Sequence, residues 1–453
     1  MKKYFLAFVL PCLGMLGGNT SVTCAAKQQT EELYSRFQTA RCDQRVAVYW
    51  YWMSDNISVE GVERDLEAMK KAGIDRAFIG NIWEGSIKPG GIKVLTPEWW
   101  DVLHAALKKA TQLDIQIGLF NCPGWSQSGG PWIEPRQSMR YLAQQHVGVE
   151  GNGQLQHIAL PVVGEDAQDV RVMAVPAFAH KSVTCQMEKE AGVSVTKEIH
   201  LEEPMWLRSV LFETPAYLLV DVGLEAKVDG KYRMLRTEHL DRTNHNLNVG
   251  FHPLAPISLS IPDVCAQDFR LTLLGGGQPT KLTVTLSEQP LVERYEEKTL
   301  GKMFQSPLPM WDEYMWPTRP EPLQAGTVVQ PSQVIDLTGL MNEDGVLTWK
   351  VPDGKWTIYR TAMLTTGVTN GPASPEATGL EVDKMSRKHV ASHFDSFMGE
   401  VLRRIPAKDR RCLVATVEDS YEMGGQNWTD DMIPVFRRTY GYDPVPWLPV
   451  MFG

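Results

Sequence analysis

The chain has 453 residues, of which 43% are hydrophobic and 22% are charged. This composition is typical of a globular protein and argues against a peptide, a small disulfide scaffold or a disordered chain. The net charge of −9 lacks the positive footprint that nucleic-acid binding requires, so we expect no nucleic-acid partner.

The N-terminus has the pattern of a secretory signal peptide. Lys2 and Lys3 precede an apolar run over residues 4–16, and small residues around Cys24 offer a cleavage site. The apolar run is shorter than the roughly 20 residues that span a bilayer, and no later segment reaches that length. We therefore expect a signal peptide over residues 1–26, export to the periplasm, the cell surface or the extracellular space, and no membrane span.

Residues 45–136 alternate strand signals with helix signals. Residues 47–53 predict an aromatic strand, and a helix follows in which Ser58 is the N-cap and Gly73 ends the apolar periodicity. The same signals predict a second strand over Asp75–Ile82, a second helix that opens at Thr96 and Pro97, and a third strand over Ile115–Cys122. This order predicts a parallel α/β sheet, either doubly wound or closed into a (β/α) barrel.

The pattern changes over residues 137–355, where short β-rich runs are separated by turn residues. These runs predict one or two antiparallel sandwich domains inserted into the first fold. Residues 356–453 then resume the first pattern, with a helix over 387–404 and a strand over 412–417. On the predicted helix we place the following residues on the apolar side: Val390, Phe394, Phe397, Val401 and Leu402.

Two further features admit more than one interpretation. His389 and His393 are four residues apart on the predicted helix, but HVASH lacks the glutamate of a zinc-binding HExxH motif, so we interpret the pair as helix surface. Trp50 and Trp52 share one face of the first strand. Core packing is the favoured role for these two rings, and a platform on which sugars stack is the alternative.

Polar and aromatic residues collect where the predicted strands end. Asn121 and Trp125 follow the third strand, and Glu418, Asp419 and Glu422 follow the last one. Catalytic groups of parallel α/β folds gather at these carboxyl ends. Neighbouring carboxylates raise one another's pKa, as a general acid at neutral pH requires. A solvated acidic loop is the equal alternative.

The segment after this acidic loop favours the catalytic interpretation. We expect Asn427 to cap a helix that carries Trp428, which would fix the loop in place. A second acidic pair, Glu381 and Asp383, shares one face if its segment is extended. Two such carboxylates suit a calcium ion or a polyol, whereas a surface turn with Lys384 as ion-pair partner is the alternative.

Four sequence blocks are long and specific, and they span about Trp50 to Gly453. They read WYWMSDNISVEGVERDLEAMKKAGID, FNCPGWSQSGGPWIEP, TNGPASPEATGLEVDKMS and VEDSYEMGGQNWTDDMIPVFRRTYGYDPVPWLP. In this order they resemble the signature blocks of α-L-rhamnosidases of glycoside hydrolase family 106. The resemblance implies a secreted, calcium-dependent enzyme of plant-polysaccharide breakdown that removes terminal α-L-rhamnose with inversion. It also implies a (β/α) barrel interrupted and followed by β-sandwich domains.

The resemblance also assigns site residues. Glu422 matches the glutamate of the family's Asp-Ser-aromatic-Glu block, which implies that it is the general acid. Further matching positions are expected to bind the sugar or the metal, and they are Asn121, Trp125, Glu381, Asp383, Asp419 and Asn427. The individual calcium ligands are not identified.

One departure from the family concerns the second catalytic group. Similar proteins continue for several hundred residues past Gly453, and that part supplies the general base and later barrel strands. Inversion needs two carboxyl groups roughly 6.5 to 9.5 Å apart, a general acid and a general base. Within this chain, only Glu381 and Asp383 are candidates for the general base that acts with Glu422. Four or five predicted strands are also fewer than the eight of a closed barrel. We therefore expect either an incomplete barrel that needs the missing C-terminal segment or a fold that closes differently from that of the family.

The sequence thus predicts an exported glycoside hydrolase that acts on a rhamnose-containing glycan. One alternative is a glycosidase of the same architecture with another sugar specificity. The other is a truncated, non-catalytic carbohydrate-binding protein.

Overall fold

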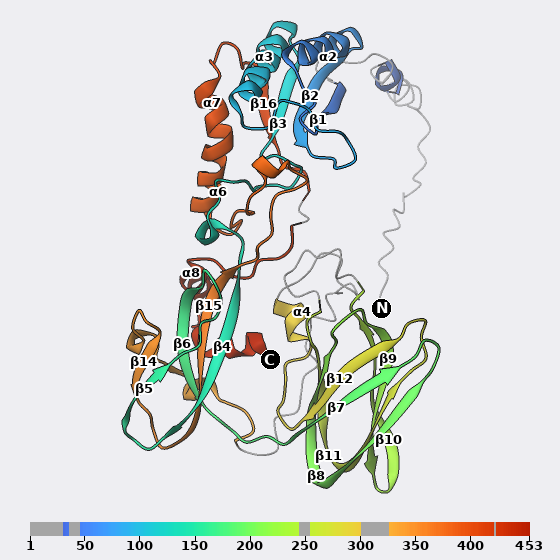
Figure 1. Cartoon of the computed structure of the whole chain (residues 1–453), viewed down its shortest axis with the longest axis vertical. Helices are drawn as coiled ribbons and strands as arrows, with labels where there is room; N and C mark the ends of the chain where they lie inside the picture. The colour runs from blue at the N-terminus through green and yellow to red at the C-terminus, as the bar shows by residue number, and fades with distance from the viewer. Residues whose placement is uncertain (1–29, 36–45, 244–253, 300–325, 421–422) are drawn as a thin grey trace, which may run out of the picture.

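The computed structural model describes residues 30–35, 46–243, 254–299, 326–420 and 423–453. The predicted signal peptide, residues 1–26, lies outside the described residues. None of the helices in the described ranges is long and apolar enough to cross a membrane. The chain forms a parallel α/β unit and two antiparallel β units (Figure 1). The α/β unit combines residues 46–120 with residues 387–417, whereas residues 428–448 pack on the smaller β unit.

The α/β unit contains a parallel sheet of four strands in the order β1-β2-β3-β16. The strands are β1 (Val46–Met53), β2 (Ile74–Ile82), β3 (Gln116–Phe120) and β16 (Leu413–Val417). The predicted strands and their alternation with helices are therefore confirmed. Within the described ranges β1 and β16 remain the sheet's edges, so closure into a barrel is not seen.

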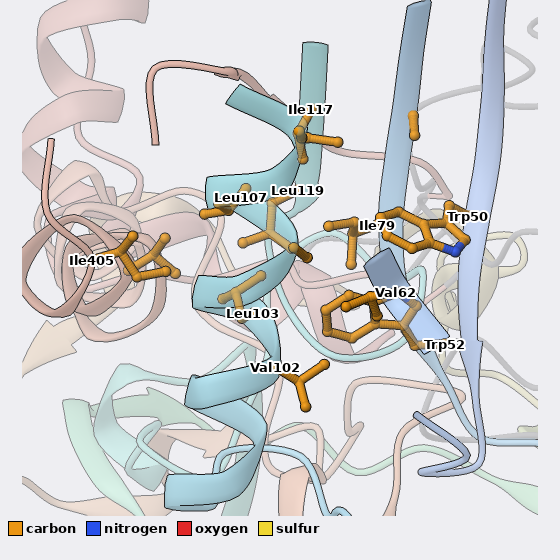
Figure 2. Close-up of a cluster of buried hydrophobic side chains, with 14 of the residues drawn as sticks. Trp50, Trp52, Val62, Ile79, Val102, Leu103, Leu107, Ile117, Leu119 and Ile405 are labelled. Atoms are coloured by element: carbon orange, nitrogen blue, oxygen red, sulfur yellow. The ribbon is translucent and has the colours of Figure 1, made fainter. Parts of the chain in front are cut away.

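Helices α2 (Val59–Lys71) and α3 (Pro97–Leu113) begin where the sequence predicts. The Ser58 hydroxyl accepts a hydrogen bond from the Gly61 amide, and Thr96 caps α3 in the same way with Pro97 in its first turn. Both helices pack on one face of the sheet, where Trp50 and Trp52 are buried among aliphatic side chains (Figure 2). The core-packing interpretation of these two rings is confirmed.

The opposite face of the parallel sheet is aromatic. Tyr49 and Tyr51 alternate with the two tryptophans along β1, and their rings contact Phe120 at centroid distances of 5.9 and 6.0 Å. The Tyr49 side chain is 54% exposed, so this face is only partly covered. A strand that buries indoles on one side thus presents phenols on the other.

The helix predicted over 387–404 forms in three pieces, α6 (Arg387–Phe394), a π-helical turn (Asp395–Gly399) and α7 (Glu400–Arg404). The predicted apolar side is partly wrong, because Val390, Phe394 and Leu402 are exposed. The buried row is instead His389, His393, Phe397, Met398 and Val401. The π turn inserts a residue into the helical repeat and so shifts the buried face between α6 and α7.

The smaller β unit contains a sheet in the order β13-β6-β15-β4 and the antiparallel pair β14-β5. Its strands are β4 (Arg140–Gly151), β5 (Leu155–Ala159), β6 (Gln168–Pro176), β13 (Ile335–Asp336), β14 (Val346–Lys350) and β15 (Gly354–Thr365). Because β15 pairs with β4 as far as Thr365, the insertion extends beyond the predicted boundary at residue 355. Four further helical turns of three residues each are η1 (Pro135–Gln137), η3 (Pro331–Gln333), η4 (Thr338–Leu340) and η5 (Pro375–Ala377).

The larger β unit is a sandwich built from one continuous sheet, in the order β10-β9-β11-β8-β12-β7. Its strands are β7 (Ser182–Lys189), β8 (Val195–Glu213), β9 (Leu219–Val228), β10 (Lys231–Asp241), β11 (Ile257–Leu273) and β12 (Thr280–Ser287). The long strands β8 and β11 pair with each other across two register shifts, and their halves pair with β12 and β9 respectively. Each long strand thereby serves both layers around one apolar core.

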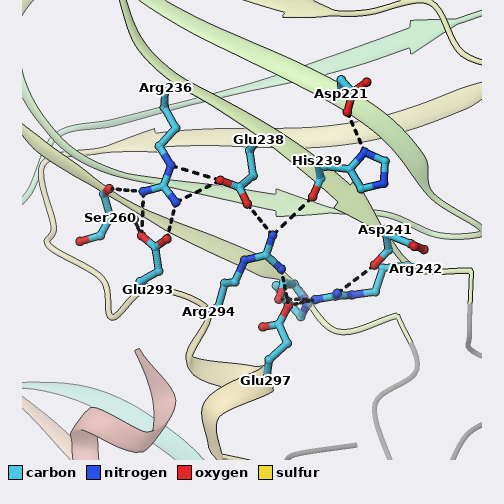
Figure 3. Close-up of polar contacts among 11 residues, drawn as sticks. Asp221, Arg236, Glu238, His239, Asp241, Arg242, Ser260, Glu293, Arg294 and Glu297 are labelled. Atoms are coloured by element: carbon cyan, nitrogen blue, oxygen red, sulfur yellow. Dashed lines mark hydrogen bonds and ion pairs between the residues drawn. The ribbon is translucent and has the colours of Figure 1, made fainter. Parts of the chain in front are cut away.

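A chain of ion pairs ties this sandwich to the segment that leaves it, helix α4 (Tyr295–Thr299). Arg294 bridges Glu238 of β10 and Glu297 of α4, and Arg242 also binds Glu297 (Figure 3). Helix α4 contacts η7 (Val445–Phe452), which follows α8 (Met432–Tyr440) near the end of the described chain. The network therefore holds the sandwich against the C-terminal segment.

Candidate functional site

The loop that follows β3 is fixed at the carboxyl end of the parallel sheet. The Asn121 amide donates a hydrogen bond of 3.0 Å to the Val417 carbonyl, which extends the pairing of β3 with β16. Further along, the Ser420 amide donates to the Trp125 carbonyl at 3.1 Å, and Ser126 forms a parallel bridge with Ser420. The residues after β3 and those after β16 are therefore side by side, as the topology rule for strand ends predicts.

A second segment, residues 370–381, clamps the β3 loop. The Gly371 carbonyl accepts hydrogen bonds from the Trp125 and Ser126 amides, both at 3.1 Å. Gly124 has φ +85°, and a Cβ there would lie 2.6 Å from the Gly371 carbonyl group. Only glycine satisfies both the left-handed backbone and the close approach, so this glycine allows the loop before Trp125 to pack directly against Gly371.

Tyr51, Trp125 and Asp419 form the partly open surface of this edge. The Tyr51 and Trp125 rings lie 6.2 Å apart, and Trp125 is half-buried. Partial burial and then the Asp419 carboxylate raise the pKa of the Tyr51 phenol, which locates Asp419 near this ring. A carboxylate beside two aromatic rings is a combination that binds sugars, because the rings cover the apolar face of a sugar and the carboxylate accepts from its hydroxyls.

Tyr51 lies in the polar and aromatic end of the first strand, where the sequence predicts catalytic groups to gather, but it is not among the individually predicted site residues. Its signal was available, since it alternates with Trp50 and Trp52 on the first strand and lies near that strand's carboxyl end.

Glu422, the predicted general acid, lies outside the described residues. Ser420 is the last described residue before it. The hydrogen bond from the Ser420 amide to the Trp125 carbonyl brings the chain to the aromatic surface. The catalytic role of Glu422 stays a prediction.

Asn121 lies beneath the β3 loop rather than on its surface. The side chain is only 3% exposed, and its Nδ2 donates to the Gln127 carbonyl at 3.1 Å. Its Oδ1 has no hydrogen-bond partner among the described residues. In this structure Asn121 closes the loop that carries Trp125, and a direct contact with sugar stays a prediction.

Glu381 is fully buried against the same loop. One carboxylate oxygen accepts from Lys384 Nζ at 2.6 Å, whereas Oε1 has no hydrogen-bond partner within the described ranges. Burial, and to a smaller degree the negative charge of Glu381, raises the pKa of the neighbouring Cys122 thiol to about 12. Cys122 is therefore a protonated core residue, not a nucleophile.

Asp383 is also fully buried, and its two oxygens accept four hydrogen bonds. Arg140 Nη2 and Thr429 Oγ1 bind one oxygen at 2.8 and 2.7 Å. The Met385 amide and Gln426 Nε2 bind the other at 2.9 and 2.6 Å. Each acceptor direction is occupied by a protein donor, so Asp383 anchors the junction between β4 and the segment 426–430. A role in binding sugar or metal stays a prediction.

The prediction that Asn427 caps the following helix is wrong. Helix α8 begins at Met432 with Asp431 as its N-cap residue. The Asn427 amide instead accepts from the Leu142 amide at 2.9 Å and donates to the Thr299 carbonyl at 3.1 Å. Asn427 lies in an extended segment next to β4, where its side chain satisfies backbone groups of two other segments and has no helix end to cap.

The prediction that His389 and His393 lie on a helix surface is also wrong. His393 is fully buried, and its Nδ1 accepts a hydrogen bond of 3.1 Å from Trp132 Nε1. Burial lowers the pKa of His393 to about 4, so the ring is neutral at physiological pH. His389 is 5% exposed and its Nε2 contacts Asp430 at 3.0 Å. The two rings have different partners and do not form a shared metal site.

The described residues contain no group of three or more His, Cys, Asp or Glu side chains that could hold a metal ion. Glu381 and Asp383, the pair that the sequence suggested for calcium, are instead neutralised by Lys384 and Arg140. Calcium takes six to eight oxygen ligands, and these two residues do not provide such a set. No calcium-dependent step follows from the described part of the chain.

Residues 38–453 match the α-L-rhamnosidase family, glycoside hydrolase family 106. The chain belongs to this family. A solved rhamnosidase from Novosphingobium sp. PP1Y is similar in structure, with a TM-score of 0.72 and 28% sequence identity over 93% of this chain. A protein of Formosa agariphila named "Putative beta-glucuronidase" is 26% identical over 455 aligned residues. The chain spans 42% of the rhamnosidase and 28% of the Formosa protein.

Proposed function

We propose that this chain forms part of an inverting glycoside hydrolase that removes terminal α-L-rhamnose from plant polysaccharides or glycosides, with Glu422 as general acid. The observation that carries the proposal is the backbone hydrogen bond between Ser420 and Trp125. It brings the acidic segment to an aromatic surface at the carboxyl end of the sheet. A deoxy sugar has an apolar methyl group and ring face, which suit the Tyr51 and Trp125 rings.

In the proposed reaction, the Glu422 carboxyl group protonates the glycosidic oxygen as the bond to rhamnose breaks. A second carboxylate, roughly 6.5 to 9.5 Å away, activates the water that attacks the opposite face of the sugar. Neither Glu381 nor Asp383 suits this second role, because both are fully buried and held by Lys384 and Arg140. We expect a different carboxylate to act as general base.

Three wider expectations belong to the same proposal. The parallel sheet is proposed to be part of a (β/α) barrel, and its edges β1 and β16, which have no further partner strand among the described residues, would accept additional strands. Export is proposed from the N-terminal pattern, residues 1–26. Calcium dependence is proposed from the family resemblance alone.

The test is hydrolysis of aryl α-L-rhamnosides by the chain, by its Glu422→Gln variant and by a Glu418→Gln control from the same acidic loop. General-acid catalysis contributes about 10²- to 10⁴-fold, so E422Q should lose that factor with a poor leaving group and much less with a good one. E418Q should lose much less than E422Q, because Glu418 is exposed and is expected to act only as a neighbouring charge, not as the group that transfers the proton. Equal rates for E422Q and E418Q on both substrates would refute the assignment, and a chelator arm tests the calcium proposal.

The name of the Formosa relative favours a second candidate, a glycosidase specific for a uronic acid. An aryl β-D-glucuronide tested in parallel separates the two specificities. If neither substrate is cleaved but the chain is retained on a glycan affinity gel, the non-catalytic carbohydrate-binding alternative is supported.

A further inference from the structure

A cavity of about 390 Å³ lies where the α/β unit meets the smaller β unit, outside the site described above. Its walls come from η1, the start of β6, the first turn of α6 and the segment before α8. The lining residues are Arg136, Gln137, Gln168, Lys388, His389 and Asp430. The volume is within the range of cavities that hold small ligands.

Two cations lie at the rim of this cavity. Arg136 and Lys388 are both exposed, and Arg136 pairs with Glu134 through its Nε at 2.9 Å. Lys388 is in the first turn of α6, where the helix dipole adds positive potential. In a chain with a net charge of −9, this grouping of positive charge favours an anionic ligand.

The cavity also contains neutral donors. Gln168 accepts from Arg140 through Oε1 at 2.9 Å, and Gln137 accepts from the Glu134 amide through Oε1 at 3.1 Å. With the oxygen of each amide engaged in this way, the Nε2 groups are the ones that can donate to a ligand. The deeper wall is His389, whose Nδ1 is buried without a hydrogen-bond partner among the described residues.

Asp430 adds a negatively charged hydrogen-bond acceptor to the cavity. Its side chain is 50% exposed, and its oxygens bind Arg140 at 2.6 Å and His389 at 3.0 Å. Partial burial acts to raise the pKa of Asp430, but the hydrogen bonds from Arg140 and His389 outweigh it and lower the pKa. The group is therefore an ionised acceptor that attracts hydroxyl groups and repels a bare anion.

We propose that this cavity binds an acidic sugar residue, meaning a sugar ring that carries a carboxylate or a sulfate group. Arg136 and Lys388 bind the anionic group, Asp430 accepts from the sugar hydroxyls, and the two glutamine amides donate to ring or hydroxyl oxygens. The site does not depend on the hydrolytic reaction. It would hold a neighbouring acidic unit of a glycan whichever bond the protein cleaves.

The test measures binding of four probes to the full chain by calorimetric titration: D-glucuronate, D-glucose 6-sulfate, D-glucose and inorganic sulfate. At least one of the two acidic sugars should bind at least about tenfold more tightly than D-glucose and than inorganic sulfate. Comparing glucuronate with the sulfated sugar decides which anionic group is preferred. Equal affinity for D-glucose, or for inorganic sulfate alone, would overturn the proposal.

The variant pair Arg136→Ala with Lys388→Ala should weaken binding of the preferred acidic sugar by at least about tenfold. The matched control, Lys231→Ala with Arg233→Ala, removes the same charges from exposed positions on the larger sandwich and should leave the affinity unchanged. Equal loss in both variants would mean a general charge effect and would refute a built site.

The two proposals fail separately. Glu422→Gln should slow cleavage of aryl rhamnosides that have a poor leaving group and leave binding of the acidic sugar intact. R136A/K388A should weaken binding of the acidic sugar and leave that cleavage unchanged. If binding of glucuronate depends on Trp125 and not on Arg136 and Lys388, the uronate occupies the candidate active site, and the second site is refuted.

Discussion

Replacing Asp383 with alanine tests whether this carboxylate is a structural anchor or a sugar ligand. Asp383 and Arg140 are both fully buried, and Nη2 of the arginine lies 2.8 Å from the carboxylate. The substitution leaves the guanidinium of Arg140 with Asp430 as its remaining ion-pair partner. It also removes the acceptor of Thr429 Oγ1 and Gln426 Nε2.

The expected cost in the free energy of unfolding follows from these partners. Breaking a buried ion pair by removing one member costs about 3 to 5 kcal/mol, because an uncompensated charge stays behind. Each orphaned neutral donor adds up to about 1 to 3 kcal/mol, although such terms do not add fully. Asp430 keeps one Arg140 contact, which places the expectation for Asp383→Ala at the lower end, about 3 kcal/mol.

The assay is chemical denaturation followed by tryptophan fluorescence, with Glu60→Ala as control. Glu60 pairs with Arg64 at an exposed position, with side chains 74% and 76% accessible, so its loss should cost less than about 1 kcal/mol. If D383A unfolds within 1 kcal/mol of the original chain while glycan binding or turnover collapses, Asp383 is a sugar ligand and the structural reasoning is refuted.

Two further predictions concern the same region. Gly124→Ala should lower the free energy of unfolding by at least about 2 kcal/mol, because alanine is strained at a φ of +85° and collides with the Gly371 carbonyl. The control Gly148→Ala has open space around its Cβ and should change that free energy by no more than about 0.5 kcal/mol. Equal melting temperatures of the two variants would contradict this prediction. His393 should favour folding above pH 6.5 and lose that contribution as the pH falls toward 4, because its pKa drops from 6.5 to about 4 on burial. At about 1.4 kcal/mol per pKa unit, this loss reaches about 3 kcal/mol. His393→Asn should therefore reduce the dependence of the free energy of unfolding on pH below 6.5. The control His146→Asn, at an exposed position, should leave that dependence unchanged. An unchanged slope in the His393 variant would show that another group controls it.

The sequence predicts those elements well whose signals are local. Helices α2 and α3 begin at the predicted caps because Ser58 and Thr96 satisfy their own first turns, which no distant residue has to arrange. Residues whose roles depend on distant partners were misjudged. Asn427 has the chemistry of a cap but binds Leu142 and Thr299, which are far away in the sequence.

The helix with the two histidines shows the same limit. Periodicity places Val390 and Phe394 inside, because a hydrophobicity pattern treats histidine as polar. The structure buries His393 instead, since Trp132 supplies the hydrogen bond that makes a neutral imidazole inexpensive to bury. The π turn then restores an ordinary apolar face from Phe397 onward.

The acidic residues divide by their partners rather than by their spacing. Glu381 and Asp383 looked like a catalytic or metal-binding pair, yet each lies in the interior opposite its own cation. Asp419 has no ion-pair partner within the described part of the chain, is exposed, and acts electrostatically on Tyr51 at the open end of the sheet. A carboxylate that must exchange protons or hydroxyl contacts with a substrate has to remain accessible. The search for the two catalytic carboxyl groups should therefore begin at the aromatic edge formed by Tyr51 and Trp125, and not in the buried acidic pair.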